Sequence, residues 1–361
     1  MPSIQAIRIA SISIPMREPL ATSLHVYDEA DYVVVWLQLS DGAEGFGEAR
    51  ESLQITGESR DGIASSIRSE LTPALIGRDA DDVEGAHRAM NAACTGNTAA
   101  KSAVDMALFD ALGQSRGLPV SCLLGGAPRG AVDSSKAISV GATGAMVAQA
   151  KRFVDTGFNT LKIKTGINEV AELNAIAAIR DGVGPAINLK LDANQAWSLP
   201  DATRFLSAAA RYNIQMVEQP LPAFDYRGSA ALRRRISMPL MLDEGVRSPQ
   251  DAFKAIEAGA CDYINIKLVK TGGLYPASKL VAVAESAGVA CQIGTLDTTI
   301  GSAAAVHLVH SRPAIRFAEI NGPSRVSFDL ASGFTLQNGQ ADIKRAPGLG
   351  IDVDRNRLAF S

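Results

Sequence analysis

Five short apolar segments between Thr160 and Lys267 each end in a charged residue. The five terminal residues are Lys164, Asp192, Glu218, Asp243 and Lys267. They recur roughly every 25 to 30 residues, the length of one strand–helix unit in a parallel α/β repeat. A charge at the end of a buried strand is costly unless it is paired or bound to a metal. The five charges recur at a similar spacing in the order lysine, three acids, lysine. The pattern therefore predicts parallel strands whose charged ends lie together in one functional site.

The order of these charges also predicts a place and a chemistry for them. Parallel strands of a (β/α) barrel point their carboxyl ends to one face, and that face carries the active site. Three carboxylates there form an all-oxygen set suited to Mg²⁺ or Mn²⁺ rather than to zinc or copper. A divalent cation between two lysines would lower the lysine pKa toward the range of a general base. The set therefore predicts removal of a proton next to a carboxylate, with the resulting enediolate held by the metal.

The motifs around these residues resemble the signature of the enolase superfamily. The motifs are Lys162-Ile-Lys164, Leu191-Asp-Ala-Asn194, Val217-Glu-Gln-Pro220, Leu242-Asp-Glu-Gly245 and Asn265-Ile-Lys267. As a set they are similar to the muconate-lactonizing subgroup of the mandelate racemase/muconate lactonizing family, which carries Lys-x-Lys and an opposite lysine. Enolase-superfamily sites use a lysine or histidine base with Mg²⁺. The resemblance covers nearly the whole chain.

This resemblance implies a modified (β/α)8 barrel, of the (β/α)7β type, with an α+β capping domain. We predict that residues 1–125 form the capping domain, residues 126–323 form the barrel, and residues 324–361 return to the capping domain. The pattern near the N-terminus agrees, because residues 4–14 and 31–40 alternate apolar and polar side chains as antiparallel strands do.

The resemblance also implies roles for the charged strand ends. Asp192, Glu218 and Asp243 would bind Mg²⁺, with Mn²⁺ as an alternative. Lys164 and Lys267 would act as acid and base on opposite faces of the substrate α-carbon. We therefore expect a small-molecule carboxylate as the substrate.

Four further residues are predicted to lie around the substrate. Lys162 would contact the substrate carboxylate and depress the pKa of Lys164. Asp297 resembles the acidic residue of muconate-type enzymes after the seventh strand, although the loop is one residue shorter and has Asp in place of Glu. Glu319, at the end of the eighth strand, resembles a muconate-type Glu that is followed shortly by Gly-Pro. Asn194 is expected to orient carboxylates rather than to bind the metal.

Three places in the chain have a less definite prediction. Lys136 is a charge within the first predicted barrel strand, residues 134–140, and either points outward between helices or reaches the substrate. The loops at residues 21–27 and 54–59 belong, in the family, to the part that reads the distal end of the substrate. Residues 270–273, Lys-Thr-Gly-Gly, are predicted as a turn rather than as a phosphate loop.

Composition excludes several other classes of protein. A net charge of −3 and the absence of a polybasic run argue against nucleic-acid binding. There is no signal peptide and no apolar run of about 18 residues, so we expect a cytoplasmic enzyme with no membrane partner. Four scattered cysteines favour reduced thiols. None of the four histidines ends a predicted strand, which argues against zinc and against a histidine base. We expect a homo-oligomer.

Three reactions fit the predicted site. Two opposed lysines suit racemisation or epimerisation of an amino-acid derivative, which we favour. They also suit muconate cycloisomerisation, in which one lysine protonates the enolate, and a dehydratase acting by β-elimination is a third possibility. Residues 55–59 and 95–101 are similar to the dipeptide epimerases, but the Asp-x-Asp that those enzymes carry on the eighth strand is here Glu319-Ile-Asn321. A protein that only binds a ligand would be expected to have lost one of the five strand-end charges, and all five are present.

Overall fold

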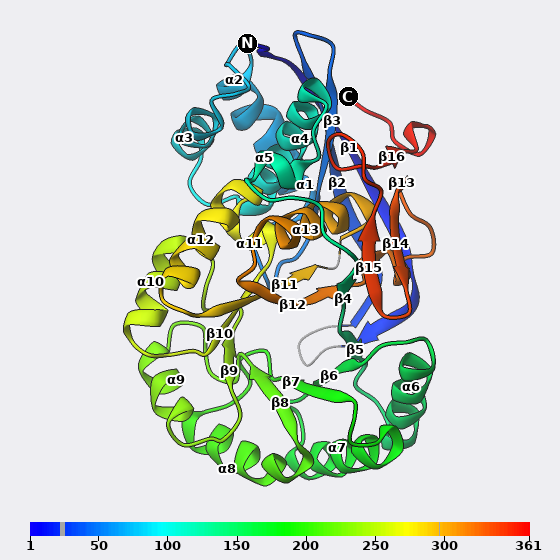
Figure 1. Ribbon diagram of the computed structural model, residues 1–361, viewed down its shortest axis with the longest axis vertical. Helices are drawn as coiled ribbons and strands as arrows, with labels where there is room; N and C mark the ends of the chain where they lie inside the picture. The colour runs from blue at the N-terminus through cyan, green and yellow to red at the C-terminus, as the bar shows by residue number, and fades with distance from the viewer. Residues whose placement is uncertain (22–25, 296) are drawn as a thin grey trace.

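An eight-stranded parallel sheet, curled into a ring, is the centre of the computed structural model (Figure 1). The structure describes residues 1–21, 26–295 and 297–361. The strands follow one another around the ring in chain order: β5 (Lys136–Ile138), β6 (Thr160–Lys164), β7 (Asn188–Asp192), β8 (Ile214–Glu218), β9 (Leu240–Leu242), β10 (Tyr263–Ile266), β11 (Ala290–Thr295) and β12 (Ile315–Ile320).

Every connection between consecutive barrel strands contains a helix on the outside of the ring (Figure 1). These helices are α6 (Thr143–Asp155), α7 (Glu169–Val183), α8 (Leu199–Ala209) with a 3-10 turn η2 (Ala210–Tyr212), α9 (Tyr226–Arg233), α10 (Pro249–Glu257), α11 (Leu268–Thr271), α12 (Leu274–Ser286) and α13 (Thr299–Ser311). The chain thus alternates strand and helix and ends the ring on a strand, which confirms the predicted (β/α)7β barrel.

Two serines close the ring between its first and last strands. The Ser135 N–H donates to the carbonyl oxygen of Ala318 (2.8 Å), and the Ser134 hydroxyl accepts from the N–H of Ile320 (2.9 Å). The sequence predicts a strand over residues 134–140, but β5 is shorter because these two serines bond sideways to β12. The closure brings the end of β12 next to β5.

The outer helices begin at side-chain caps. Asn168, Ser198, Asp225 and Ser248 each accept a hydrogen bond from the backbone N–H three residues later, at the starts of α7, α8, α9 and α10. Such caps satisfy N–H groups that the first helical turn leaves unpaired. Each of these helices therefore begins at a residue fixed by its own local sequence. The carboxyl ends of the preceding strands lie together at one end of the barrel.

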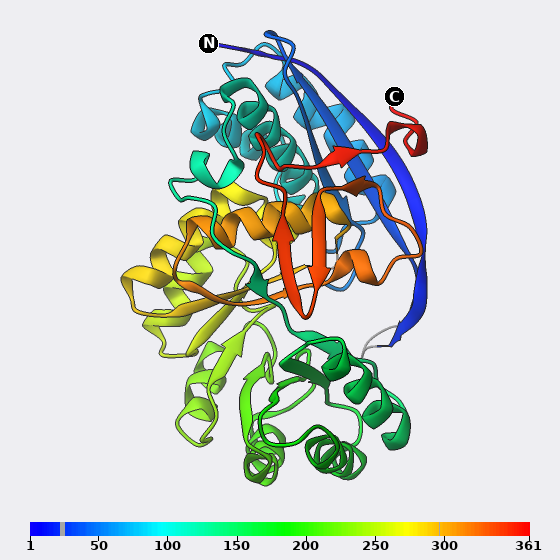
Figure 2. The same cartoon turned by 45° about the vertical axis from the view of Figure 1, so that its right-hand side comes forward.

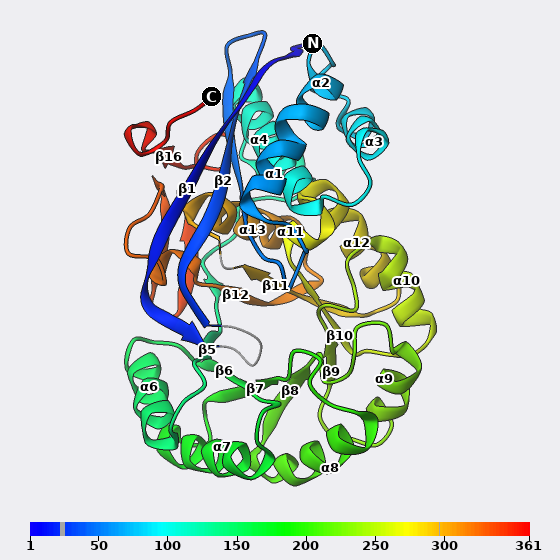
Figure 3. The ribbon, with the colours of Figure 1, turned by 180° about the vertical axis from the view of Figure 1, so that it is seen from behind.

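The capping domain is a three-stranded antiparallel sheet covered by helices on one side (Figure 3). Its strands are β1 (Ile4–Ala21), β2 (Val26–Leu39) and β3 (Glu44–Arg50). Its helices are α1 (Arg60–Ser66), the π-helix η1 (Ile67–Leu71), α2 (Thr72–Leu75), α3 (Val83–Ala93), α4 (Thr98–Arg116) and α5 (Val120–Leu123). Both long strands extend beyond the predicted ranges 4–14 and 31–40, and together they run down beside the barrel.

Strand β2 is buried on both faces, which joins the two parts of the molecule. Val33 and Val35 pack into the core formed with the capping helices, whereas Tyr32 and Val34 belong to the core that continues into the barrel. Successive side chains of a strand point to opposite faces, so one strand contributes to both cores. The sheet is therefore a shared wall between the capping helices and the barrel.

The C-terminal segment runs back along the outside of both parts (Figure 2). It contains the 3-10 turns η3 (Gly322–Ser324) and η4 (Arg355–Arg357) and the strands β13 (Ala331–Ser332), β14 (Phe334–Gln337), β15 (Gln340–Ile343) and β16 (Asp352–Val353). Strand β15 pairs with β4 (Val132–Asp133), and Ser361 exchanges two backbone hydrogen bonds with Ile9 of β1. The boundaries at residues 125 and 323 remain predictions. Within the described residues, no helix is long and apolar enough to cross a membrane.

Gly47 allows β3 to lie directly against α4, so a side chain there should destabilise the fold. A Cβ at Gly47 would lie 2.0 Å from the carbonyl oxygen of Ala103 and 2.7 Å from the N of Ala107. We expect Gly47→Ala to lower the free energy of unfolding by about 1–3 kcal/mol or more, because backbone atoms must move. Urea unfolding followed by circular dichroism measures this change. Gly130→Ala is the control, because a Cβ there meets nothing within 4 Å; equal stability of the two variants would contradict the prediction.

Candidate active site

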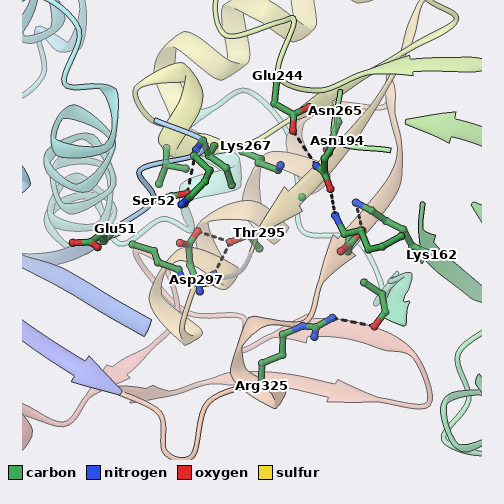
Figure 4. A pocket seen from close by; sticks show the side chains of 18 residues that line it. Glu51, Ser52, Lys162, Asn194, Glu244, Asn265, Lys267, Thr295, Asp297 and Arg325 are labelled. Carbon is green, nitrogen blue, oxygen red and sulfur yellow. Dashed lines mark hydrogen bonds and ion pairs between the residues drawn. The ribbon is translucent and has the colours of Figure 1, made fainter. Parts of the chain in front are cut away.

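A cavity lies at the carboxyl ends of the barrel strands, next to the capping sheet (Figure 4). The barrel contributes side chains from β6, β10, β11 and β12 and from the loops after β7 and β9. The capping domain contributes Arg50, at the end of β3, and the loop that follows it, including Gln54 and Ile55. Of the two loops that the sequence links to substrate recognition, the one at 54–59 therefore contributes to the cavity wall, whereas residues 22–25 of the other lie outside the described residues.

The three predicted metal-binding acids lie side by side at this end of the barrel. Asp192 is in register with Glu218 on the next strand, and Glu218 is in register with Met241, two residues before Asp243. Each acid is buried, with at most 1% of its surface exposed. Burial of three carboxylates is costly without compensation, and lysines supply it.

Lys162 lies between the three predicted metal-binding acids and the acid of the last strand. Its Nζ lies 3.0 Å from a carboxylate oxygen of each of Asp192, Glu218 and Glu319. Burial lowers the pKa of Lys162, but these carboxylates outweigh burial and raise that pKa well above its usual value. Lys162 is therefore an ammonium group that lies between the acids and the cavity, where it was predicted to contact the substrate carboxylate.

Lys164 and Asn194 form a second group beside Asp192. Lys164 Nζ donates to Asp192 Oδ2 (2.6 Å) and to Asn194 Oδ1 (2.8 Å). The Asn194 side chain in turn donates to Glu244 Oε1 (3.0 Å), and its backbone N–H donates to Asp192 Oδ1 (3.0 Å). Its φ of 44° is in the left-handed region, which asparagine tolerates better than most residues. This backbone turn lets Asn194 touch both the lysine and the acid.

Two lysines hold Asp243. Lys267 Nζ donates to Asp243 Oδ2 (2.5 Å), and Lys270 Nζ donates to Asp243 Oδ1 (2.5 Å). Burial would raise the pKa of Asp243, but Lys267 and Lys270 outweigh burial and lower it. Burial lowers the pKa of Lys267, yet Asp243 outweighs burial and raises it. The lowered lysine pKa that the sequence suggests depends on a bound cation and stays a prediction.

The three acids fit a hard divalent cation by donor type. Glu218 Oε2 accepts no hydrogen bond within the described part of the chain, although the Lys162 ammonium lies 3.0 Å away. Across residues 1–21, 26–295 and 297–361, no group of three His, Cys, Asp or Glu side chains is arranged to hold a metal ion. Lysine ammonium groups contact the three acids instead. Burial raises the pKa of Glu218 to about 7 despite Lys162, and a cation would relieve that strain on the charged form.

Asp297 and Glu319, the two other predicted substrate contacts, both line the cavity. The Asp297 carboxylate accepts a hydrogen bond from the Thr295 hydroxyl. Burial raises the pKa of Asp297, while Thr295 and Arg50 oppose that rise. Glu319 differs, because burial would raise its pKa but Lys162 and Lys164 outweigh burial and lower it. Glu319 is thus an ionised partner of Lys162.

Asn321, two residues beyond Glu319, turns away from the cavity. Its Nδ2 donates to the carbonyl oxygen of Ser135 (2.8 Å), and its Oδ1 accepts from Nε of Arg325 (2.9 Å). Arg325 in turn lines the cavity (Figure 4). At the position where dipeptide epimerases were expected to carry a second acid, this chain therefore has a neutral side chain that supports a cation.

Several residues of the site were not singled out from the sequence. Asn265 donates to Glu218 Oε1 (2.9 Å) and stands two positions before Lys267. The period of two in a strand puts both on one face, so the sequence held a signal for Asn265. The sequence held no such signal for Lys270, because its side chain turns back from α11 to reach Asp243. Arg325 had none either, since it follows an irregular turn.

Lys136 does not line the cavity. Its Nζ donates to the Ser324 hydroxyl and lies 5.7 Å from the ring centroids of Phe153 and Phe158. Burial, together with the nearby Arg325, lowers the pKa of Lys136 to about 7. Of the two positions that the sequence leaves open, the outward one is correct.

Comparison with known proteins identifies the family of this chain. Residues 4–125 match the model described as mandelate racemase / muconate lactonizing enzyme, N-terminal domain, and residues 145–357 match the model described as enolase C-terminal domain-like. The chain belongs to the mandelate racemase/muconate lactonizing family of the enolase superfamily. This confirms the predicted family, and its members establish the chain as an isomerase.

Characterised relatives match over almost their whole length. The L-Ala-D/L-Glu epimerase of Bacillus subtilis is 36% identical over 96% of this chain and 95% of its own, and its substrate-liganded structure has a TM-score of 0.94, covering 99% of both chains. The N-succinyl-L-Arg/Lys racemase of Bacillus cereus is 32% identical over 98% and 96% of the two chains, with a TM-score of 0.96. A dipeptide epimerase of Enterococcus faecalis, complexed with Mg and L-Leu-L-Tyr, is 33% identical with a TM-score of 0.94, covering 97% and 99% of the two chains.

Lys270 should contribute strongly to stability, since it neutralises Asp243 inside the protein. Its side chain is fully buried, with three backbone carbonyl acceptors besides the carboxylate. Removing one partner of a buried pair leaves the other charge uncompensated, so we expect Lys270→Met to lower the free energy of unfolding by about 3–5 kcal/mol. Urea unfolding measures the loss. Lys344→Met is the control, because Lys344 and its partner Asp352 are exposed and such pairs contribute little. A Lys270 variant as stable as the control would contradict this account.

Proposed function

We propose that this protein is a Mg²⁺-dependent racemase or epimerase that moves the α-proton of an N-acylated amino acid. The observation that carries the proposal is the placement of Lys164 and Lys267. They come from β6 and the end of β10, four strands apart in a ring of eight, and both line the cavity. Two amines on opposite sides of one bound carbon suit removal of a proton from one face and its return to the other.

In this proposal Asp192, Glu218 and Asp243 hold the Mg²⁺. The bound cation would supply positive charge that stabilises the substrate carboxylate as it gains electron density. Relatives' structures that contain Mg, together with the donor type of the three acids, support this assignment. The predicted use of Mn²⁺, the homo-oligomeric state and the cytoplasmic location stay predictions.

The chain's own residues would divide the remaining work. Lys162, held as an ammonium by Asp192 and Glu218, would fix the substrate carboxylate. One of Lys164 and Lys267 must be neutral to accept the α-proton, and the other must be charged to donate one. Asn194 and Glu244 would keep Lys164 directed at the α-carbon through their hydrogen bonds. Because these groups are positioned before the reaction, they lower its barrier instead of only binding the substrate.

The end of β12 favours a substrate without a free ammonium group. Glu319 is the one acid there that faces the cavity, and Lys162 already lies 3.0 Å from its carboxylate. Asn321 is neutral and engaged with Ser135 and Arg325. An ammonium group in this part of the cavity would lose its water without gaining an unshared carboxylate, which is unfavourable. An N-acyl group that carries no positive charge avoids this loss.

Muconate cycloisomerisation is the alternative within the same family. It would use the same acids and lysines, and Glu319 beside Lys162, followed by Gly322 and Pro323, favours it. In that reaction only one lysine would handle the proton, and the other would act through its charge. A dehydratase acting by β-elimination is the third candidate.

Isotope exchange at the α-carbon should separate the two lysines. With N-acetylated amino acids in D₂O and Mg²⁺, we expect wild-type protein to exchange the α-hydrogen of both enantiomers. Lys267→Ala should stop racemisation and leave exchange of one enantiomer, through Lys164. Lys164→Ala should leave exchange of the other enantiomer only. Proton NMR measures both rates, and a chelator should abolish them until Mg²⁺ is added back.

Two results would reject this mechanism. Exchange of both enantiomers at equal rates by either single variant would mean that the lysines do not serve opposite faces. Undiminished turnover by chelator-treated protein would remove the metal from the proposal. Exchange by one lysine alone, together with lactone formation from a muconate, would establish the cycloisomerase instead.

A pair of matched substrates tests the preference against an ammonium group. L-Ala-L-Glu and N-propanoyl-L-glutamate differ only by the ammonium group of the alanine. We expect kcat/KM for epimerisation at the glutamate α-carbon to be roughly 10-fold or more higher for the N-propanoyl compound, since a poorly compensated charge costs at least about 1.4 kcal/mol. Polarimetry or chiral chromatography follows both reactions. If the dipeptide is the better substrate, Glu319 binds an ammonium group and the proposed substrate class is wrong.

A further inference from the structure

Arg325 is a cation of the cavity wall that the proposed reaction does not use. It follows η3, beyond the end of β12, and its side chain lines the cavity. Figure 4 shows it on a part of the wall well apart from Lys267 and Glu244. Lys267 and Glu244 therefore lie elsewhere on the wall, so Arg325 would face another part of the substrate.

The hydrogen-bond partners of Arg325 are neutral. Its Nε donates to Asn321 Oδ1 (2.9 Å), and one Nη donates to the carbonyl oxygen of Ala137 (3.4 Å). Within the described residues, no carboxylate oxygen lies within 4.0 Å of its guanidinium nitrogens. Glu319 and Glu18 attract it from a greater distance, and Arg50 repels it.

This arrangement leaves a partly buried positive charge incompletely compensated. Glu319 is shared with Lys162 at 3.0 Å, so its charge does not belong to Arg325 alone. Burial lowers the pKa of Arg325, as expected for a cation removed from water. A charge partly removed from water gains from a close counterion, and a guanidinium has five donors in a planar fork suited to a carboxylate. Asn321 holds the group in place without neutralising it.

We propose that Arg325 determines specificity by binding a second anionic group of the substrate, a carboxylate at the end of the N-acyl chain or of the amino-acid side chain. This inference rests on the proposed function for the rest of the substrate. Asn321 is the positioning residue, because its amide oxygen orients the guanidinium and adds no negative charge. The substrate would then be a dicarboxylate, with one carboxylate beside Lys162 and the other at Arg325.

Equilibrium binding tests the inference without requiring turnover. N-succinylglycine and N-butanoylglycine differ only in a terminal carboxylate or methyl on the acyl chain. N-acetyl-L-glutamate and N-acetyl-L-norvaline differ in the same way on the side chain. Isothermal titration with Mg²⁺ present should show that, in at least one pair, the dianion binds wild-type protein roughly 10- to 100-fold more tightly, the range expected for a hydrogen-bonded charge pair. The pair that shows it identifies the arm that reaches Arg325.

Three variants assign the preference to this residue. Arg325→Gln should bring the two affinities to within roughly 3-fold. Asn321→Asp should also reduce the preference, because it gives the guanidinium a carboxylate of its own. Lys136→Gln is the matched control: it removes a neighbouring amine that lies outside the cavity, so the preference should persist. Thermal unfolding of each variant establishes that it is folded.

The outcomes separate this inference from the proposed function. Equal affinity for both members of both pairs in wild-type protein would overturn the inference, as would a preference that persists in Arg325→Gln. Loss of the preference in Lys136→Gln to the same extent would mean that the general positive field, not Arg325, selects the dianion. If dianions bind through Arg325 but no N-acyl amino acid exchanges its α-hydrogen, the inference stands and the proposed function fails. If N-acyl amino acids exchange their α-hydrogen but no preference for the dianion depends on Arg325, the proposed function stands and the inference fails.

Discussion

The burial of three carboxylates at one end of the barrel is the constraint on which the site depends. Asp192, Glu218 and Asp243 are almost completely removed from water, and each touches a lysine at 3.0 Å or less. Buried charges persist only when the geometry of their partners is good. The lysines therefore have a structural role. The same side chains line the cavity, where the proposed proton transfer would use them.

The capping domain is held on the barrel by buried acids that bond to backbone N–H groups across the interface. Glu48 of β3 accepts from Gly301 N (2.7 Å) near the start of α13. Asp105 of α4 accepts from Leu274 N (2.5 Å) at the start of α12 and contacts His87. Such acceptors satisfy N–H groups that the first turn of a helix leaves unpaired. Because these contacts fasten the capping sheet to the rim, the wall formed by Arg50 and the following loop has a defined place over the lysines.

The end of β12 gives one acid and one amide different surroundings. Glu319 lies 3.0 Å from Lys162, whereas the fully buried Asn321 contacts Ser135 and Arg325. Strand β12 ends at Ile320, where it pairs with β11 on one side and bonds to Ser134 and Ser135 on the other. Asn321 therefore lies beyond the strand, and its amide oxygen accepts a hydrogen bond from Arg325, which lines the cavity.

The strand–helix repeat and the place of the lysines and acids at its strand ends followed from the sequence by itself, because this repeat is a local pattern with a constant period. The family followed from the resemblance of the motifs around those charges. Asn265 was within reach of the same argument through its spacing from Lys267. The inward turn of Lys270, the outward turn of Lys136 and the place of Arg325 were decided only by the tertiary structure. Lys270 lies in a short helix, Arg325 follows a 3-10 turn, and Lys136 lies in a strand of three residues. These elements are too short for a repeating pattern to predict where a side chain points. Their positions depend on which distant segments close the ring and cover its mouth.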